Sequence, residues 1–325
     1  MFVDNRFTFK IFILIYYVFL MKYSFSQDLI DYSINASLLT ETDQLIIKQK
    51  ISFVNKNNLL NKLYLNDWSN SYSSTKSPLA DRLVEEYTRS FYLSAKSKIG
   101  YSLVSNIYVN GEKAEWKRNK INLDIIEINF AKPLKEGIVN IDLSYIVKLP
   151  SSKFTGYGKI KKNQYFLENF FITLSKFDDY KQIFYSNLDL EEVPINSSKF
   201  DIELKIDKDL NVFSSLDLIN SNEKNGEVFY LFKSNKIKQV IFLIGDGELK
   251  LNEFTLDEKL ININLNLKDF KFESQKRSVK NIFQFVESID AIEQPSKILI
   301  TNEKYSKRPF YGLSIMPTFL NSFSR

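Results

Sequence analysis

The residue types that do most protein chemistry at neutral pH are missing from this sequence, which contains no histidine and no cysteine. Histidine is the commonest general base and the usual ligand of catalytic zinc, while cysteine supplies thiolate nucleophiles and disulfides. Within these 325 residues the two absences exclude a zinc peptidase helix of the H-E-x-x-H type, a thiol nucleophile and a disulfide scaffold.

The remaining chemistry would have to use carboxylates, lysines or serines. Two acidic pairs, Asp178-Asp179 and Glu191-Glu192, lie in segments that read as loops, where adjacent acids are usually solvated. Serine is plentiful, but no G-x-S-x-G elbow is present, so a Ser/Lys dyad is the one serine mechanism left open. The sequence therefore predicts no catalytic residue and no metal ligand in this chain.

Two loops begin like ligand sites and then depart from the required pattern. The first starts at Asp207 as a calcium loop would, but it has Val212 in place of the glycine and Leu218 in place of the bidentate glutamate. The second, Gly245-Asp246-Gly247, lacks the Lys-Ser/Thr ending of a phosphate loop. Both are predicted to be turns.

The N-terminus has the pattern of a signal peptide over residues 1–26. Arg6 and Lys10 precede the apolar run Ile11–Leu20, and small residues occupy the −3 and −1 positions before Gln27. We expect an exported chain, periplasmic or secreted, with no membrane span after cleavage. A retained anchor is the alternative, although ten apolar residues are short of the roughly 20 that a spanning helix needs.

The charge balance argues against nucleic acid as a partner. The net charge is +5, and residues 1–26 contribute +2 of it, which leaves +3 for the remaining chain. No cluster of arginine and lysine with interleaved aromatic residues is present, so the sequence predicts no nucleic-acid binding. The length is sufficient for two domains.

Residues 27–206 are predicted to form an antiparallel β-sandwich because strands of alternating polarity are separated by short turns. Leu45–Trp68 reads as two strands around a polar turn, and Asn110-Gly111 has the sequence of a tight hairpin. Ser69–Lys76 is predicted to be a polar loop. Pro78–Tyr92 is predicted to be a helix capped by Ser77, with Leu79, Leu83 and Tyr87 on one face.

Residues 207–325 are predicted to be a β-rich lobe that also contains a helix, so the whole chain is mostly β. Leu260–Phe272 alternates as a strand does, Ser278–Asp290 has helical spacing, and Ile298–Thr301 reads as a short buried strand. Asn225-Gly226 and Asp246-Gly247 mark two more hairpins. The apolar segment Arg308–Phe323 contains Pro309, Gly312 and Pro317 and is predicted to be a shaped loop.

An ordered set of short motifs resembles the N-terminal part of the aminopeptidase N-like gluzincin metallopeptidases, especially their exported Bacteroidetes branch. The resemblance covers about residues 31–323. The motifs, in chain order, are Ile51–Asn55, Leu63–Asn70, Gly100-Tyr101, Val109–Gly111, Lys132–Leu134 with Gly137, Leu149-Pro150 with Gly156, Phe200–Ile202, Arg308–Leu313 and Met316-Pro317.

This resemblance implies a β-sandwich followed by the β-rich first lobe of a thermolysin-like catalytic domain, truncated before the zinc helix. In the full-length family zinc is the cofactor, and its H-E-x-x-H helix would come after Arg325. No cofactor is expected in this chain itself. Phe170–Ile172 lies where many members have a Trp-Phe-Pro segment.

The resemblance also implies one substrate-cleft loop. The five residues concerned stand near the position of the family's Gly-x-Met-Glu-Asn motif, which binds the amino terminus of the substrate, and the segment contains no glutamate. They are Tyr311, Gly312, Leu313, Met316 and Pro317.

Three hypotheses follow from the sequence. The first is the non-catalytic N-terminal portion of an exported metallopeptidase, which binds peptide substrate only if a C-terminal catalytic half completes it. The second is an exported β-sandwich module that binds a protein or peptide partner. The third is a complete hydrolase that uses a Ser/Lys pair or carboxylates alone. The sequence does not set the oligomeric state.

Overall fold

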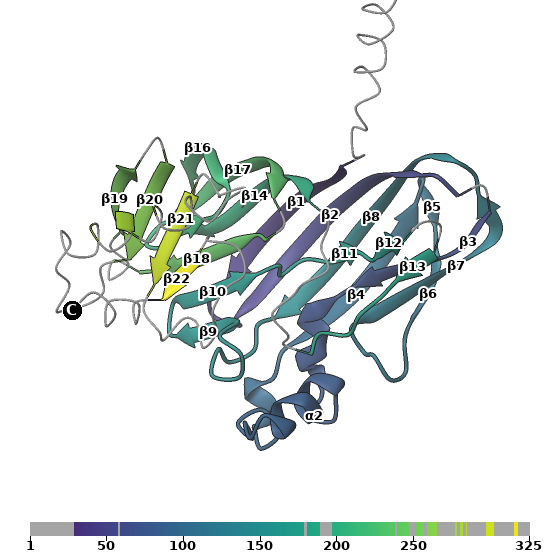
Figure 1. Cartoon of the computed structure of the whole chain (residues 1–325), viewed down its shortest axis with the longest axis horizontal. Helices are drawn as coiled ribbons and strands as arrows, with labels where there is room; N and C mark the ends of the chain where they lie inside the picture. The colour runs from purple at the N-terminus through teal and green to yellow at the C-terminus, as the bar shows by residue number, and fades with distance from the viewer. Residues whose placement is uncertain are drawn as a thin grey trace, which may run out of the picture.

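The structure is a computed structural model of the whole chain (Figure 1). It describes residues 29–57, 59–178, 181–188, 197–237, 239–246, 251–256, 259–264, 277, 280, 281, 284, 297–301 and 315–317. The predicted signal peptide, the Glu191-Glu192 pair, Asp179 and Gly247 lie outside these residues, as does most of the predicted helix Ser278–Asp290. Within the described part of the chain, no helix combines the length and apolar character needed to cross a membrane.

The described chain is mostly β, as predicted, and its largest unit is a sheet of eight strands (Figure 1). Its strands in spatial order are β16 (Asp217–Lys224), β17 (Glu227–Ile237), β14 (Ser198–Asp207), β1 (Ile30–Leu39), β2 (Gln44–Asn55), β8 (Gly137–Lys148), β4 (Tyr101–Val109) and β5 (Glu112–Lys113). Neighbouring strands are antiparallel except β1 and β14, which run parallel.

Two sheets of four strands pack on one face of the large sheet. The first contains β11 (Thr173–Leu174), β3 (Leu60–Asn66), β7 (Ile125–Leu134) and β6 (Glu115–Arg118). The second contains β15 (Asn211–Ser214), β18 (Ile241–Gly245), β10 (Gln164–Glu168) and β9 (Gly158–Lys161). The short strands β12 (Lys176–Asp178) and β13 (Lys181–Ile183) form a separate hairpin.

The core lies between these layers and is rich in aromatic rings. Tyr32 on β1 stacks on Phe200 of β14, with ring centroids 5.0 Å apart, and its hydroxyl accepts a hydrogen bond from the Leu174 N–H of β11. Phe232 on β17 meets Phe242 on β18 edge to face at 5.1 Å. Each such pair contributes about 1 kcal/mol beyond the burial of its area, so these aromatic residues stabilise the core.

Leu45–Trp68 is not a hairpin, although both predicted strands are present. β2 pairs with β1 and β8 in the large sheet, whereas β3 pairs with β7 and β11 in the opposing sheet. The chain crosses between layers at Asn55, whose buried side chain donates to the carbonyls of Asn57 and Lys135. The side-chain amide satisfies backbone groups that a hairpin would have paired, and so it fixes the crossing.

The tight hairpins at the two Asn-Gly pairs are confirmed. Asn110 and Gly111 join β4 to β5 with φ of 51° and 83°, and Asn225 and Gly226 join β16 to β17 with φ of 55° and 79°. Both central residues therefore lie in the left-handed region that asparagine and glycine tolerate best.

The predicted domain boundary after residue 206 falls inside the large sheet, because β14 before it pairs with β17 after it. A further sheet of four strands follows, made of β19 (Leu251–Leu256), β20 (Lys259–Asn264), β21 (Lys297–Thr301) and β22 (Ile315–Pro317). β20, β21 and β22 are parallel to one another. The division into two domains stays a prediction.

The predicted helix begins as expected but ends early. In α2 (Pro78–Glu85) the Ser77 hydroxyl accepts a hydrogen bond from the Ala80 N–H, and Leu79 and Leu83 are buried. The prediction for Tyr87 is wrong: it follows the helix with a φ of 60° and is 97% exposed. Two adjacent acids at the helix C-terminus oppose the helix dipole, which favours an early end.

Candidate functional site

The predicted cleft loop is described only in part. Tyr311, Gly312 and Leu313 lie outside the described residues. Met316 and Pro317 belong to β22, where they pair in register with Ile300 and Thr301 of β21. These two residues are therefore strand residues, where a loop was predicted, and proline is tolerated there because β22 is an edge strand. Their role toward a substrate stays a prediction.

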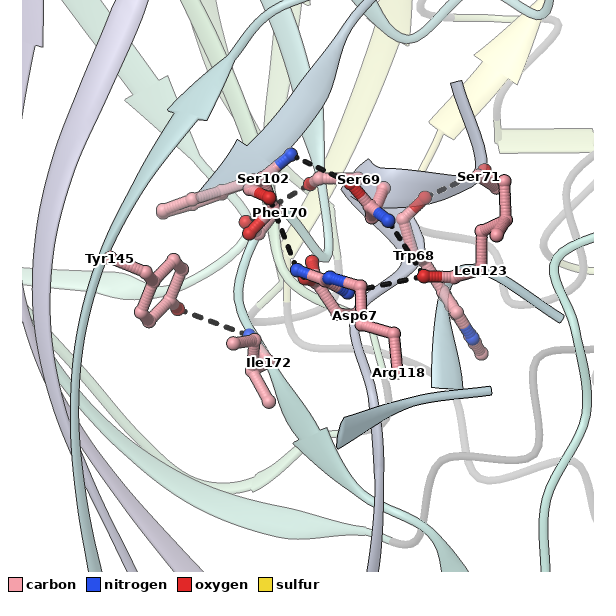
Figure 2. Close-up of polar contacts among 11 residues, drawn as sticks. Asp67, Trp68, Ser69, Ser71, Ser102, Arg118, Leu123, Tyr145, Phe170 and Ile172 are labelled. Atoms are coloured by element: carbon pink, nitrogen blue, oxygen red, sulfur yellow. Dashed lines mark hydrogen bonds and ion pairs between the residues drawn. The ribbon is translucent and has the colours of Figure 1, made fainter. Parts of the chain in front are cut away.

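A polar region that the sequence did not predict is buried between the sheets (Figure 2). It forms where β3 ends and the short 3-10 helix η1 (Trp68–Ser73) begins. We call it the Asp67–Arg118 cluster, and its members are Asp67, Asn70, Ser102, Arg118 and the Leu123 carbonyl. Asp67 lies between β3 and η1, Asn70 lies in η1 and Arg118 lies in β6, whereas Ser102 of β4 contributes its backbone N–H and carbonyl, so the cluster joins both layers of the sandwich.

Arg118 is the centre of the cluster. Its Nη2 donates to the Asp67 Oδ2 at 2.7 Å and to the Ser102 carbonyl at 3.1 Å, and its Nη1 donates to the Leu123 carbonyl at 3.1 Å. Asp67 is buried, whereas the Arg118 side chain is 21% exposed. A buried carboxylate needs a charged, hydrogen-bonded partner, and the guanidinium fork supplies it together with donors for two backbone carbonyls.

Asn70 completes the cluster with its side-chain amide. Its Nδ2 donates to the Leu123 carbonyl at 2.6 Å, and its Oδ1 accepts from the Ser102 N–H at 3.0 Å. The Asp67 N–H donates to the Asp124 carbonyl at 2.7 Å, which brings the loop before β7 against the end of β3. The prediction that Ser69–Lys76 is a polar loop is therefore wrong: its first half is a buried helical turn.

Asp124 is a second buried carboxylate beside the cluster. Its Oδ1 accepts from the Ser186 hydroxyl at 2.7 Å, and its Oδ2 accepts from the Asn187 N–H at 2.6 Å. Burial raises the pKa of Asp124 to about 6, with the negative charge of Asp67 adding to the rise and the two hydrogen bonds opposing it. This carboxylate fastens residues 186 and 187 to the corner made by η1.

Two buried tyrosines connect the same corner to the core. The Tyr157 hydroxyl lies 3.0 Å from the Ser69 Oγ, and Ser69 also donates to the Phe170 carbonyl at 3.3 Å. The Tyr145 hydroxyl donates to the Gln49 Oε1 and accepts from the Ile172 N–H. Burial raises the pKa of both phenols above its usual value, so both stay protonated at neutral pH.

The hydrogen bonds of the Asp67–Arg118 cluster and of its neighbours hold backbone segments together, and none of these side chains is placed to act as a nucleophile. The Ser69 hydroxyl contacts a protonated phenol and a carbonyl, and neither can serve as its general base. The carboxylates of Asp67 and Asp124 are both occupied by hydrogen-bond donors. In the part of the chain that the structure describes, no three His, Cys, Asp or Glu residues are grouped as a metal site would require.

Sequence reasoning missed the cluster because its members are far apart in the chain and their residue types are usually exposed. One signal could have indicated it. The polar run from Asp67 to Ser71 directly follows a strand and contains only one aromatic residue. The residue after this run and the helix that follows carry apolar side chains that must be buried, so the polar run lies between two buried elements. A polar segment held between two such elements has to be hydrogen bonded inside the protein.

Comparison with known proteins gives a likeness at the level of structure. No protein-family model matches the sequence, and no curated protein matches it either. The structure is similar to that of a two-domain M1 zinc metallopeptidase mutant bound to L-arginine, with a TM-score of 0.51 and 11% identity. It is also similar to that of an M1 zinc metallopeptidase mutant from Deinococcus radiodurans, with a TM-score of 0.50 and 12% identity.

Both alignments cover 85% of this chain and 56% of the other chain, so this chain spans little more than half the length of those enzymes. At these identities the likeness is one of fold. The chain therefore has the β-rich fold found in M1 zinc metallopeptidases, as the resemblance implied.

Proposed function

We propose that this chain is the N-terminal, non-catalytic portion of an exported metallopeptidase of the aminopeptidase N-like gluzincin family, from its Bacteroidetes branch. The observation that carries the proposal is the fold shared with M1 zinc metallopeptidases over 85% of the chain. The ordered motifs from Ile51 to Pro317 support the same assignment. The substrate class of the whole protein would be peptides, bound only when a catalytic half completes the site.

The donor set of this chain does not fit the zinc of that family. Such sites are built from histidines with a carboxylate, and this sequence has no histidine. No catalytic step is therefore assigned to these residues. Their role in the proposal is mechanical: the Asp67–Arg118 cluster and the crossing at Asn55 fix the two layers of the sandwich, so that a catalytic part has a rigid body to pack on.

The export part of the proposal rests on the N-terminal sequence alone. Arg6 and Lys10 precede ten apolar residues, and the predicted cleavage site before Gln27 follows. Fractionation of the producing cells tests it. We expect the protein outside the cytoplasm, with an N-terminus at Gln27 by mass spectrometry; an intact N-terminus in the cytoplasmic fraction would contradict export.

The coding DNA tests the peptidase part of the proposal. The codons after Arg325 should encode an H-E-x-x-H pattern in one of the reading frames, because the family places its zinc helix beyond the region that this chain resembles. Unrelated sequence in all frames would contradict the proposal and leave the β-sandwich as a protein in its own right.

One observation favours the alternative, an exported module that binds a protein or peptide. Ile46, Ile146 and Leu103 are aligned across β2, β8 and β4 on the outer face of the large sheet. Ile46 is 43% exposed and Leu103 is 57% exposed, which is unusual for aligned apolar residues. Limited proteolysis distinguishes the two proposals: protection of residues 308–323 in the isolated chain favours the module, and rapid cleavage there favours the N-terminal portion.

A further inference from the structure

The segment from α2 to the 3-10 helix η2 (Lys96–Lys98) projects from the sheets (Figure 1). We call residues 78–98 the α2–η2 projection. It is anchored from inside by Phe91, which is fully buried and packs 4.8 Å from the Phe154 ring and 5.8 Å from the Tyr72 ring. The projection is therefore anchored to the fold through Phe91.

Tyr87 stands at a backbone position that suits glycine. The Thr88 N–H donates to the Leu83 carbonyl at 2.7 Å and the Tyr87 N–H donates to the Val84 carbonyl at 3.0 Å, which is the Schellman ending of a helix. The residue at this position takes a positive φ, here 60°, where a side chain is disfavoured. The Tyr87 ring is 97% exposed, so it makes no packing contact that would offset the unfavourable backbone conformation.

Tyr92 and Leu93 present two more apolar side chains on the same projection. Tyr92 is 52% exposed and Leu93 is 73% exposed. Their backbone is fixed, because the Leu93 N–H donates to the Arg89 carbonyl and the Ser94 N–H donates to the Phe91 carbonyl, each at 3.0 Å. Three large apolar side chains are thus exposed within seven residues of ordered backbone, and exposed apolar residues that gather in this way are typical of a site that meets a partner.

The charge on this surface is positive. Residues 87–98 contain no acidic residue, and the three cations among them, Arg89, Lys96 and Lys98, are all exposed. Three acids precede them in the projection: Glu85 and Glu86 are ion-paired with Arg82 at 3.4 Å and 2.7 Å, and Asp81 is exposed. With four cations and three acids, residues 78–98 carry a net charge of +1, and the positive charge lies in residues 87–98. Within the described residues the three cations form no ion pair, so their charge is available to an external anion.

We propose that the α2–η2 projection docks the protein on an anionic lipid bilayer. Tyrosine and leucine would enter the headgroup region, while the lysines and the arginine meet the lipid phosphates. A bilayer fits better than an acidic peptide, because peptides occupy grooves and free sheet edges, whereas this surface projects outward (Figure 1). The inference does not depend on the peptidase assignment.

Vesicle co-sedimentation of the full chain tests this proposal. The probe is a vesicle of phosphatidylcholine mixed with phosphatidylglycerol, compared with pure phosphatidylcholine. Lys96→Gln/Lys98→Gln should weaken binding to the anionic vesicles roughly 30-fold, at about 1 kcal/mol for each basic residue. Tyr92→Ser/Leu93→Ser should weaken it by about tenfold or more. Every variant carries the same N-terminal segment, so the differences report on the projection.

Matched controls change the same residue types elsewhere on the surface. Lys208→Gln/Lys224→Gln removes two exposed lysines, and Ile121→Ser removes an apolar side chain that is 76% exposed. Both should leave vesicle binding within about twofold of the parent. Equal losses in controls and test variants, or no binding to anionic vesicles, would overturn the proposal. So would binding to polyglutamate without binding to vesicles, which would indicate an acidic protein partner.

Tyr87→Gly separates recognition from folding. Glycine relieves the unfavourable backbone conformation, so this variant should melt at a higher temperature than the parent. The same variant should bind anionic vesicles less well, because the exposed ring is gone. A variant that is more stable and binds vesicles as well as the parent would overturn a docking role for Tyr87 and, with an unchanged Tyr92→Ser/Leu93→Ser, the whole proposal.

Discussion

The Arg118 guanidinium of β6 and the Asp67 carboxylate, directly after β3, form an ion pair at 2.7 Å that links two strands of one four-stranded sheet. Asp67 is 2% exposed, so its charge has little access to water. Two backbone carbonyls share the same guanidinium, which makes Arg118 the side chain that connects the end of β3, β4 and the loop before β7.

Arg118→Ala should therefore lower the free energy of unfolding by about 3 kcal/mol, because it leaves the Asp67 charge buried without a partner. Urea denaturation measures the change. The nearby Lys120→Ala is the matched control; Lys120 is exposed, and its substitution should cost less than about 0.5 kcal/mol. Equal effects of the two substitutions would contradict a structural role for the cluster.

Asp124 should give the protein a distinctive pH dependence. The pKa of Asp124 is raised from 3.8 to about 6, so the folded state holds this proton more tightly than the unfolded state. Its contribution to stability is therefore greatest below about pH 4 and is lost as the pH rises through 6. The total change is about 3 kcal/mol, at 1.4 kcal/mol for each pKa unit.

Asp124→Asn removes that titration. We expect the difference in stability between the variant and the parent to shift in favour of the variant as the pH rises from 4 to 7, in urea midpoints measured at both values. At pH 4 the protonated carboxyl of the parent and the amide of the variant each keep one carbonyl acceptor for Ser186 and Asn187, so the two proteins should differ least there. A difference that does not vary with pH would refute the assignment.

Asp43 should give the stability of the protein the opposite dependence on pH. It lies in the turn between β1 and β2, where burial raises its pKa but Lys159 at 2.7 Å, Tyr165 at 3.0 Å and Lys148 at 3.3 Å lower it by more. The pKa of Asp43 is therefore lower in the folded protein than in the unfolded chain. The stability that Asp43 contributes is present at pH values above its ordinary pKa, and it is lost as the pH falls through the pKa of the folded protein.

Asp43→Asn keeps a residue that tolerates the φ of 53° and removes the charge. We expect a loss of about 1 kcal/mol at pH 7 and almost none at pH 3, by thermal unfolding. Asp43→Ala serves as the comparison, because it should lose stability at both pH values through backbone strain. A loss for Asp43→Asn that is as large at pH 3 as at pH 7 would contradict the electrostatic account.

Gly100 is required for a close approach of two backbone segments. A Cβ at this position would lie 2.7 Å from the Lys148 carbonyl oxygen and 2.8 Å from the Pro150 Cδ. Gly100→Ala should therefore cost about 1–3 kcal/mol. Chemical denaturation measures it, with the exposed Ser97→Ala as a neutral control. If alanine is accepted at 100 without loss, the packing of β4 on the end of β8 is not as described.

Local patterns were enough to predict strands and hairpins, and they failed wherever a distant contact decided the outcome. The alternation in β1, β2 and β14 identified the buried faces of these strands. The two Asn-Gly pairs identified the turns from β4 to β5 and from β16 to β17. Alternation says which face of a strand is buried, but it does not say which strand lies next to it. The crossing after β2 depends on Asn55 reaching Lys135, 80 residues away.

The Asp67–Arg118 cluster was not predicted because it too depends on contacts between residues that are distant in the sequence. Asp67 and Arg118 are 51 residues apart, and each alone reads as a surface charge. Tyr87 was misplaced because helical spacing continues beyond Glu85, whereas the chain ends the helix through backbone bonds that the spacing does not reveal. Most of the predicted cleft loop lies outside the described residues, so its position is still a prediction.

The most direct test of the central claim is an activity and metal measurement on the purified chain. Peptide hydrolysis should be absent with amino-terminal and internal cleavage substrates, and no stoichiometric zinc should be bound, because the sequence has no histidine to hold it. Hydrolysis by the isolated chain, persisting in the presence of a chelator and abolished by substitution of a serine or carboxylate, would contradict the claim that these residues form only the scaffold.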